Sequence, residues 1–65
     1  MMNKQNEQEK VLQYIKDHPN CNALEISDNA EIRLWVVYAE VENLYKDGKI
    51  KKHFTVKGVL YTSKE

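Results

Sequence analysis

Residues 22–63, NALEISDNAEIRLWVVYAEVENLYKDGKIKKHFTVKGVLYTS, carry the pattern that decides the fold. Their periodicity predicts a short helix at 23–29, a tight turn, a longer helix at 33–46 and a two-stranded hairpin within 50–63. Asn22 is expected to cap the short helix, and Glu25 three residues later is typical of a capping box. Gly48 is expected to end the longer helix in a left-handed conformation.

Apolar residues at spacings of three and four predict which sides of these helices are buried. In the longer helix this stripe consists of Leu34, Val37, Val41 and Leu44. In the short helix the candidate inward or small positions are Leu24, Ile26, Ser27 and Ala30. No glycine lies between the two helices, and Asn29 is the residue there that best tolerates a left-handed conformation.

Working outward, the segment before Asn22 predicts one more helix. Residues 1–5 are expected to fray, and residues 6–17 are rich in helix-forming side chains. Val11, Leu12 and Ile15 would form its inner face, and Pro19 prevents the helix from continuing far beyond Asp17.

In the hairpin, residues 50–55 and 59–63 read as strands and residues 56–58 as the turn. Lys52 shares a strand face with the apolar Ile50 and Phe54. A bulge, an edge position or a lysine stem that reaches out to water would resolve that conflict.

Composition limits what the chain can be. Its 65 residues form one domain with a small core, and they carry ten basic and ten acidic side chains. Residues 1–32 hold three lysines and six acidic residues, whereas residues 33–65 hold seven basic and four acidic residues. This asymmetry is compatible with a domain that has one acidic face and one basic face. A chance distribution of the charges explains it equally well.

The residue types also limit the cellular compartment and the chemistry that can be expected of the chain. Cys21 is the only cysteine, and the polar start has no signal-peptide core, so a cytoplasmic protein without a membrane segment is expected. His18, Cys21 and His53 match no closed zinc spacing. The sequence shows no nucleophile with its base, no phosphate loop and no carboxylate pair with a pocket-forming core, so we expect no enzyme, cofactor, metal or small-molecule substrate.

The stretches VLQYIKDHPNCNALEIS (residues 11–27) and VENLYKDGKIKKH (residues 41–53) resemble the winged helix-turn-helix superfamily of small bacterial and phage regulators. The spacing is similar to that of FaeA-like regulators of fimbrial operons. The resemblance implies a mainly α, α+β fold: three helices with a C-terminal β-hairpin as the wing. It also implies transcription regulation on duplex DNA, with helix 33–46 in or near the major groove and the wing on phosphate or the minor groove.

Carried onto this chain, the resemblance gives a set of candidate DNA contacts. Five lysines between residues 46 and 57, against one acidic residue, suit contact with phosphate. A solvated edge strand, on which lysines block pairing, explains the same cluster. The candidate DNA-binding residues are Arg33, Trp35, Val36, Tyr38, Asn43, Lys49, Lys51, Lys52, His53 and Lys57.

The same helix also supports a different function. Its expected outward face, residues 35, 36, 39, 40 and 43, is apolar and acidic rather than rich in base-reading side chains. A protein-interaction module or a homodimer would use that face around Trp35, with Val36, Ala39 and Glu40, since Trp is frequent at binding hot spots. Trp35 packed in the core is the third possibility.

Overall fold

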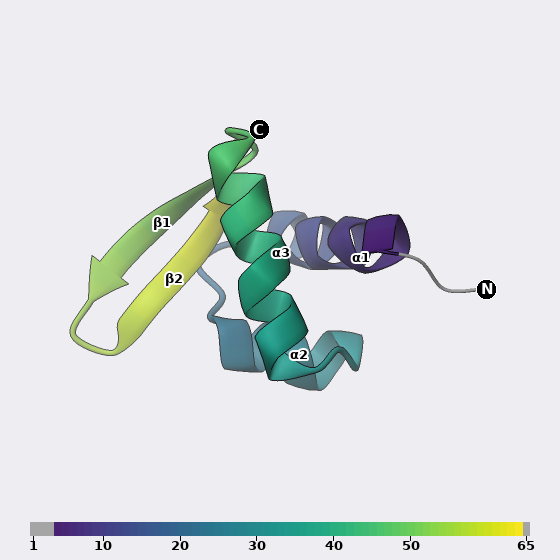
Figure 1. The fold of residues 1–65 in the computed structure, drawn as a ribbon. Helices are drawn as coiled ribbons and strands as arrows, with labels where there is room; N and C mark the ends of the chain where they lie inside the picture. Colours follow the sequence, from purple (N-terminus) through teal and green to yellow (C-terminus); the bar gives the residue numbers. More distant parts are fainter. Residues whose placement is uncertain (1–3, 65) are drawn as a thin grey trace.

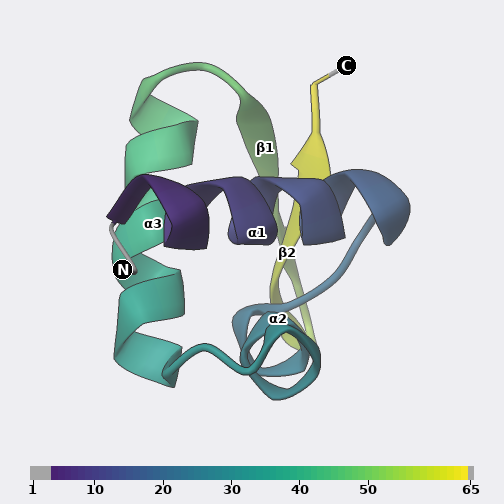
Figure 2. The same cartoon turned by 90° about the vertical axis from the view of Figure 1, so that its right-hand side faces the viewer.

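The computed structural model describes residues 4–64, with side chains from Glu7 onward. Three helices precede a two-stranded antiparallel hairpin, which makes the domain a mainly helical α+β fold (Figure 1). Helices α1 and α3 cross, α2 lies near the N-terminal end of α3, and the hairpin extends to the side away from the start of α1 (Figures 1 and 2). The elements are α1 Lys4–Asp17, α2 Ala23–Ala30, α3 Leu34–Lys46, β1 Ile50–Thr55 and β2 Gly58–Ser63.

The predicted order of elements is confirmed, with small shifts at their ends. Helix α1 begins at Lys4, two residues before the predicted start, and residues 1–3 lie outside the described residues. Helix α1 ends at Asp17, two residues before Pro19, as expected from the missing N–H of proline. Gly58 is the first residue of β2 rather than part of the turn. Residues 4–64 include no helix of the length and apolar character needed to cross a bilayer.

The start of α2 is fixed by the predicted cap. The side-chain oxygen of Asn22 accepts a hydrogen bond from the Glu25 N–H at 2.7 Å, which satisfies one of the unpaired donors of the first turn. The Glu25 carboxylate accepts a hydrogen bond from the Tyr14 hydroxyl at 2.8 Å. Burial and this bond raise the pKa of Tyr14 to about 12. Glu25 therefore joins α2 to α1.

The end of α2 differs from the prediction. Glu31, not Asn29, adopts the left-handed conformation, with φ 56 and ψ 46. Its N–H and that of Ile32 both donate to the Ser27 carbonyl, and the Ser27 hydroxyl donates to the Ile32 carbonyl at 2.6 Å. These bonds turn the chain from α2 into α3 and hold Glu31 in a conformation that side chains with a Cβ disfavour.

Replacing Glu31 with glycine is expected to raise the free energy of unfolding by about 0.5–1 kcal/mol, because glycine adopts positive φ without steric cost. Urea unfolding followed by circular dichroism measures the change. Asp28→Gly is the control within α2, where glycine should lower stability by about 0.3 kcal/mol, because its helix propensity is slightly below that of aspartate. A Glu31→Gly protein less stable than the original would show that the Glu31 side chain contributes more than its backbone conformation costs.

The end of α3 follows the prediction. Gly48 has φ 78, and its N–H donates to the Tyr45 carbonyl at 3.0 Å. The Lys49 N–H donates to the Leu44 carbonyl, also at 3.0 Å. This pair of bonds is a Schellman motif, and it directs the chain from α3 straight into β1.

The hairpin is held to the helices by one additional backbone pairing. Cys21, in the α1–α2 connection, forms an isolated antiparallel bridge with Tyr61 of β2. The Tyr61 N–H donates to the Cys21 carbonyl at 2.7 Å, and the Cys21 N–H donates to the Tyr61 carbonyl at 3.2 Å. A two-stranded sheet alone is marginal in water, so this bridge, which the sequence reading missed, helps to stabilise the hairpin.

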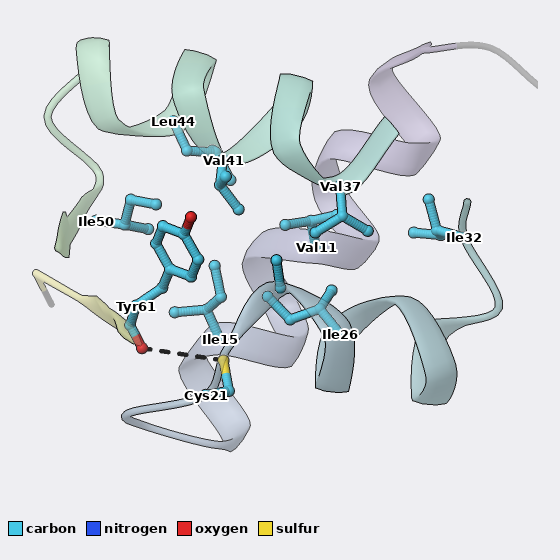
Figure 3. Close-up of a cluster of buried hydrophobic side chains, with 11 residues drawn as sticks. Val11, Ile15, Cys21, Ile26, Ile32, Val37, Val41, Leu44, Ile50 and Tyr61 are labelled. Carbon is cyan, nitrogen blue, oxygen red and sulfur yellow. Dashed lines mark hydrogen bonds between the residues drawn. The ribbon is translucent and has the colours of Figure 1, made fainter. Parts of the chain in front are cut away.

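The core lies where the three helices meet the base of the hairpin (Figure 3). Val37, Val41 and Leu44 are buried as predicted, but Leu34 is 37% exposed and Leu24 is 58% exposed, so these two expectations are wrong. The buried side chains are Val11, Ile15, Cys21, Ala23, Ile26, Ile32, Val37, Val41, Leu44, Ile50 and Tyr61.

Because Cys21 is buried, the free energy of unfolding is expected to fall at alkaline pH. Burial raises the pKa of the Cys21 thiol from 9.0 to about 11, and the Glu25 carboxylate adds to the rise. The thiol ionises near pH 9.0 in the unfolded chain and near pH 11 in the folded protein. The contribution of the protonated thiol to the free energy of unfolding is therefore complete below pH 9.0, and it is lost as the pH rises to about 11. The urea concentration at the unfolding midpoint should therefore decrease between neutral pH and the folded pKa. This decrease should be smaller for Cys21→Ala than for the original protein. Parallel falls would contradict this origin of the pH dependence.

Candidate nucleic-acid interface

The basic side chains of the hairpin occupy three different places. In the register of the two strands, Lys51 pairs with Thr62 and His53 with Leu60, so both point to the face of the hairpin away from the helices. Both are exposed, as is Lys49 at the base of the hairpin. Lys57 is exposed at the tip, next to a turn in which the Thr55 hydroxyl donates to the Gly58 carbonyl at 2.8 Å.

Lys52 points the other way, toward α3. Its ammonium forms an ion pair with the Glu42 carboxylate at 2.8 Å and lies 4.5 Å from the centre of the Tyr45 ring. The hydrogen bond to Glu42 raises the pKa of Lys52, and the same bond lowers the pKa of Glu42. The conflict noted in the sequence is therefore resolved by a lysine stem that reaches along the strand face to a charged partner. Lys52 is engaged within the fold, and it offsets the negative charge of Glu42 on α3.

A groove of about 270 Å³ separates the hairpin tip from the helices. We call it the hairpin groove. Asn22 and Ala23 contribute the start of α2, Tyr38 contributes from α3, and Lys57 contributes from the tip. The first N–H groups of a helix have no acceptor within the helix, and this end of the helix carries partial positive charge. The residues that line this hollow therefore carry three kinds of hydrogen-bond donor: helix N–H groups, a phenol and an ammonium.

The exposed face of α3 is narrower than the sequence suggested. Trp35 is 68% exposed and Tyr38 is 53% exposed, and Ala39 and Asn43 are exposed as well. Glu40, however, is only 6% exposed. Its placement on the outward face was therefore wrong.

Val36 was also expected on that face, but it is half-buried and packs against the core. The reason is that α1 covers this side of α3, which widens the buried sector beyond the apolar stripe. The core residues of α1, Val11 and Ile15, occupy the same cluster as Val37 and Val41 of α3 (Figure 3).

The structure brings only some of the predicted site residues together. Tyr38 and Lys57 meet at the hairpin groove. Arg33 is exposed just before α3, whereas Lys51 and His53 lie on the other face of the hairpin. The start of α2 was not predicted to be part of this site, although the cap at Asn22 was a signal for it.

A comparison of the chain with known protein families, curated proteins and solved structures gives no match. What the chain binds is therefore inferred from its own residues and from how they are arranged.

Proposed function

We propose that the protein is a winged helix-turn-helix regulator of transcription that binds duplex DNA. The hairpin acts as the wing, and α3 lies in or near the major groove. The observation that carries the proposal is the hairpin groove, which is lined by the N-terminus of α2, Tyr38 and Lys57. A free thiol and a DNA target both suit a cytoplasmic protein, which is part of the proposal.

A DNA phosphate fits the hairpin groove because each of the three groups stabilises negative charge. Helix N-termini bind phosphate through their free N–H groups and the helix dipole. Lys57 adds a full positive charge on a long stem, which contacts phosphate without demanding one geometry. Lys49 and Lys51 extend the positive surface along the hairpin, and His53 adds a hydrogen-bond donor there, where a neighbouring stretch of backbone would pass.

The exposed face of α3 has few side chains that could form hydrogen bonds with DNA bases. Asn43 is its only exposed amide, and Trp35 and Ala39 are apolar, so contact with thymine methyl groups and with groove shape would dominate over hydrogen bonds to bases. The two acidic residues of α3 oppose this docking less than their number suggests. Glu42 is paired with Lys52, and Glu40 is turned toward α1.

Fluorescence anisotropy of a labelled mixed-sequence duplex, titrated with the protein over a range of salt concentrations, tests the proposal. With about three to four phosphate contacts, the logarithm of the association constant should fall against the logarithm of salt with a slope of about −3. An uncharged morpholino duplex of the same sequence is the control and should not bind. Absence of DNA binding at about 50 mM salt, where such contacts are strong, would refute the proposal.

A further inference from the structure

A second hollow lies between α3 and the N-terminal part of α1. It has a volume of about 140 Å³ and is lined by Glu7, Trp35, Val36, Ala39, Glu40 and Asn43. We call it the acidic hollow. None of the residues of the hairpin groove lines it, and the start of α1 lies on the side of α3 away from the hairpin (Figure 1).

Glu40 is the unusual residue of this hollow. The side chain belongs to a residue that is 6% exposed, and its carboxylate has no hydrogen bond or ion pair with any residue whose side chain the structure describes. No polar side-chain atom among those residues is both fully enclosed and without a partner. The oxygens of Glu40 therefore keep some contact with solvent, and Glu40 lines the hollow.

A carboxylate with so little contact with water is expected to be paired with a cation or with hydrogen-bond donors. Among the residues whose side chains the structure describes, those that line the hollow include no cation, and they include a second acid, Glu7. The hollow therefore has negative charge that nothing described in the chain neutralises. A ligand that completes it must be positively charged and small enough at its end to enter about 140 Å³.

Trp35 indicates which kind of cationic group the ligand carries. Trp35 lines the hollow and is 68% exposed as a residue, an arrangement that leaves a large apolar side chain in water unless something covers it. A guanidinium group both stacks on an indole face and forms two parallel hydrogen bonds with a carboxylate, whereas an ammonium group is compact, strongly hydrated and not planar. The side-chain oxygen of Asn43 is a further acceptor for the remaining guanidinium N–H groups.

We propose that the acidic hollow is a binding site for an arginine side chain of a partner protein. The guanidinium lies between the Glu40 carboxylate and the Trp35 ring, and Glu7 adds long-range attraction. This site goes beyond DNA binding, because its ligand has the opposite charge and because Glu7 and Glu40 take no part in the proposed DNA contacts. Trp35, Ala39 and Asn43 belong both to this site and to the exposed face of α3. Its occupation would leave Lys57 and the start of α2 free for phosphate.

Nuclear magnetic resonance of the full chain with N-acetyl-arginine amide as the probe tests the site. Saturable shifts are expected for the Trp35 indole N–H and the Asn43 side-chain amide. N-acetyl-citrulline amide, which has nearly the same shape without the charge, should leave both signals in place. Glu40→Gln should weaken the arginine complex by about tenfold, the effect of losing a hydrogen bond to a charged group. Glu9→Gln, at an exposed position of α1 that does not line the hollow, should bind as the original protein does.

Thermal melting separates binding from folding. Removal of an unpaired, nearly buried charge should leave the melting temperature of Glu40→Gln equal to or above that of the original protein. Three results would each overturn the proposal: equal shifts with citrulline and arginine, unchanged affinity in Glu40→Gln, or no saturable shift with arginine. None of them depends on DNA, so the test is independent of the proposed function.

Discussion

Reversing the charge of Lys51 and Lys57 together, as Lys51→Glu and Lys57→Glu, is expected to weaken duplex binding by about 100-fold at low salt. Two phosphate contacts are lost, and each new carboxylate is repelled by the backbone that the lysine attracted. Both side chains are exposed, and neither takes part in the core, so the fold should be unaffected. Anisotropy titration measures the loss, and the salt slope should become shallower by about 2.

The matched control reverses Lys10 and Lys16, two exposed positions of α1 that do not belong to the hairpin. This variant changes the net charge by the same amount, so it corrects for overall electrostatic repulsion. Equal weakening in the two double variants would mean that the hairpin does not contact the duplex.

Shortening Leu44 to alanine is expected to lower the free energy of unfolding by about 3–5 kcal/mol. Leu44 is 1% exposed and lies where α3 meets Ile50 and Tyr61 of the hairpin (Figure 3), and removal of a buried leucine side chain leaves a cavity that such a small core cannot close. A domain of 65 residues has a total stability of about 3–10 kcal/mol. Much of the variant should therefore be unfolded near body temperature.

Leu24→Ala deletes the same atoms at a position that is 58% exposed, and it should cost less than about 1 kcal/mol. Urea unfolding followed by circular dichroism compares the two variants directly. Similar losses for both leucines would show that the core does not lie where α3 meets the hairpin.

Features set by neighbours in the sequence could be predicted from it. Pro19, Asn22 and Gly48 act through their own backbone and side-chain chemistry, and each behaves as expected: α1 ends before Pro19, Asn22 caps α2, and Gly48 ends α3. The burial of Val37, Val41 and Leu44 follows from helical spacing in the same way. These features were enough to predict the order of the elements.

Features set by distant contacts could not be predicted in this way. Glu31 takes a left-handed conformation because Ser27 and Ile32 close the turn around it. Glu40 is buried because α1 crosses α3 on that side, and no property of the α3 sequence alone specifies where another helix crosses.

Some features of the candidate site could likewise be predicted from the sequence, and others could not. The basic character of the hairpin was readable from its composition, but the direction of each lysine was not. Lys52 reaches Glu42, ten residues earlier in the chain, and the groove at Lys57 depends on how close the tip comes to α2. Strand alternation separated Lys51 and His53 from Lys52 correctly, and the register of β1 with β2 confirms that separation.

Mapping of amide signals by nuclear magnetic resonance, with and without an unlabelled duplex, tests DNA binding through the hairpin groove most directly. The proposal predicts that the largest shifts and the greatest protection from exchange fall at Ala23 and Leu24, at Tyr38, and at Lys57 and Gly58. The amides of α1 from Val11 to Asp17 should change little. Changes confined to α1, or a spectrum that the duplex leaves unaltered, would contradict it.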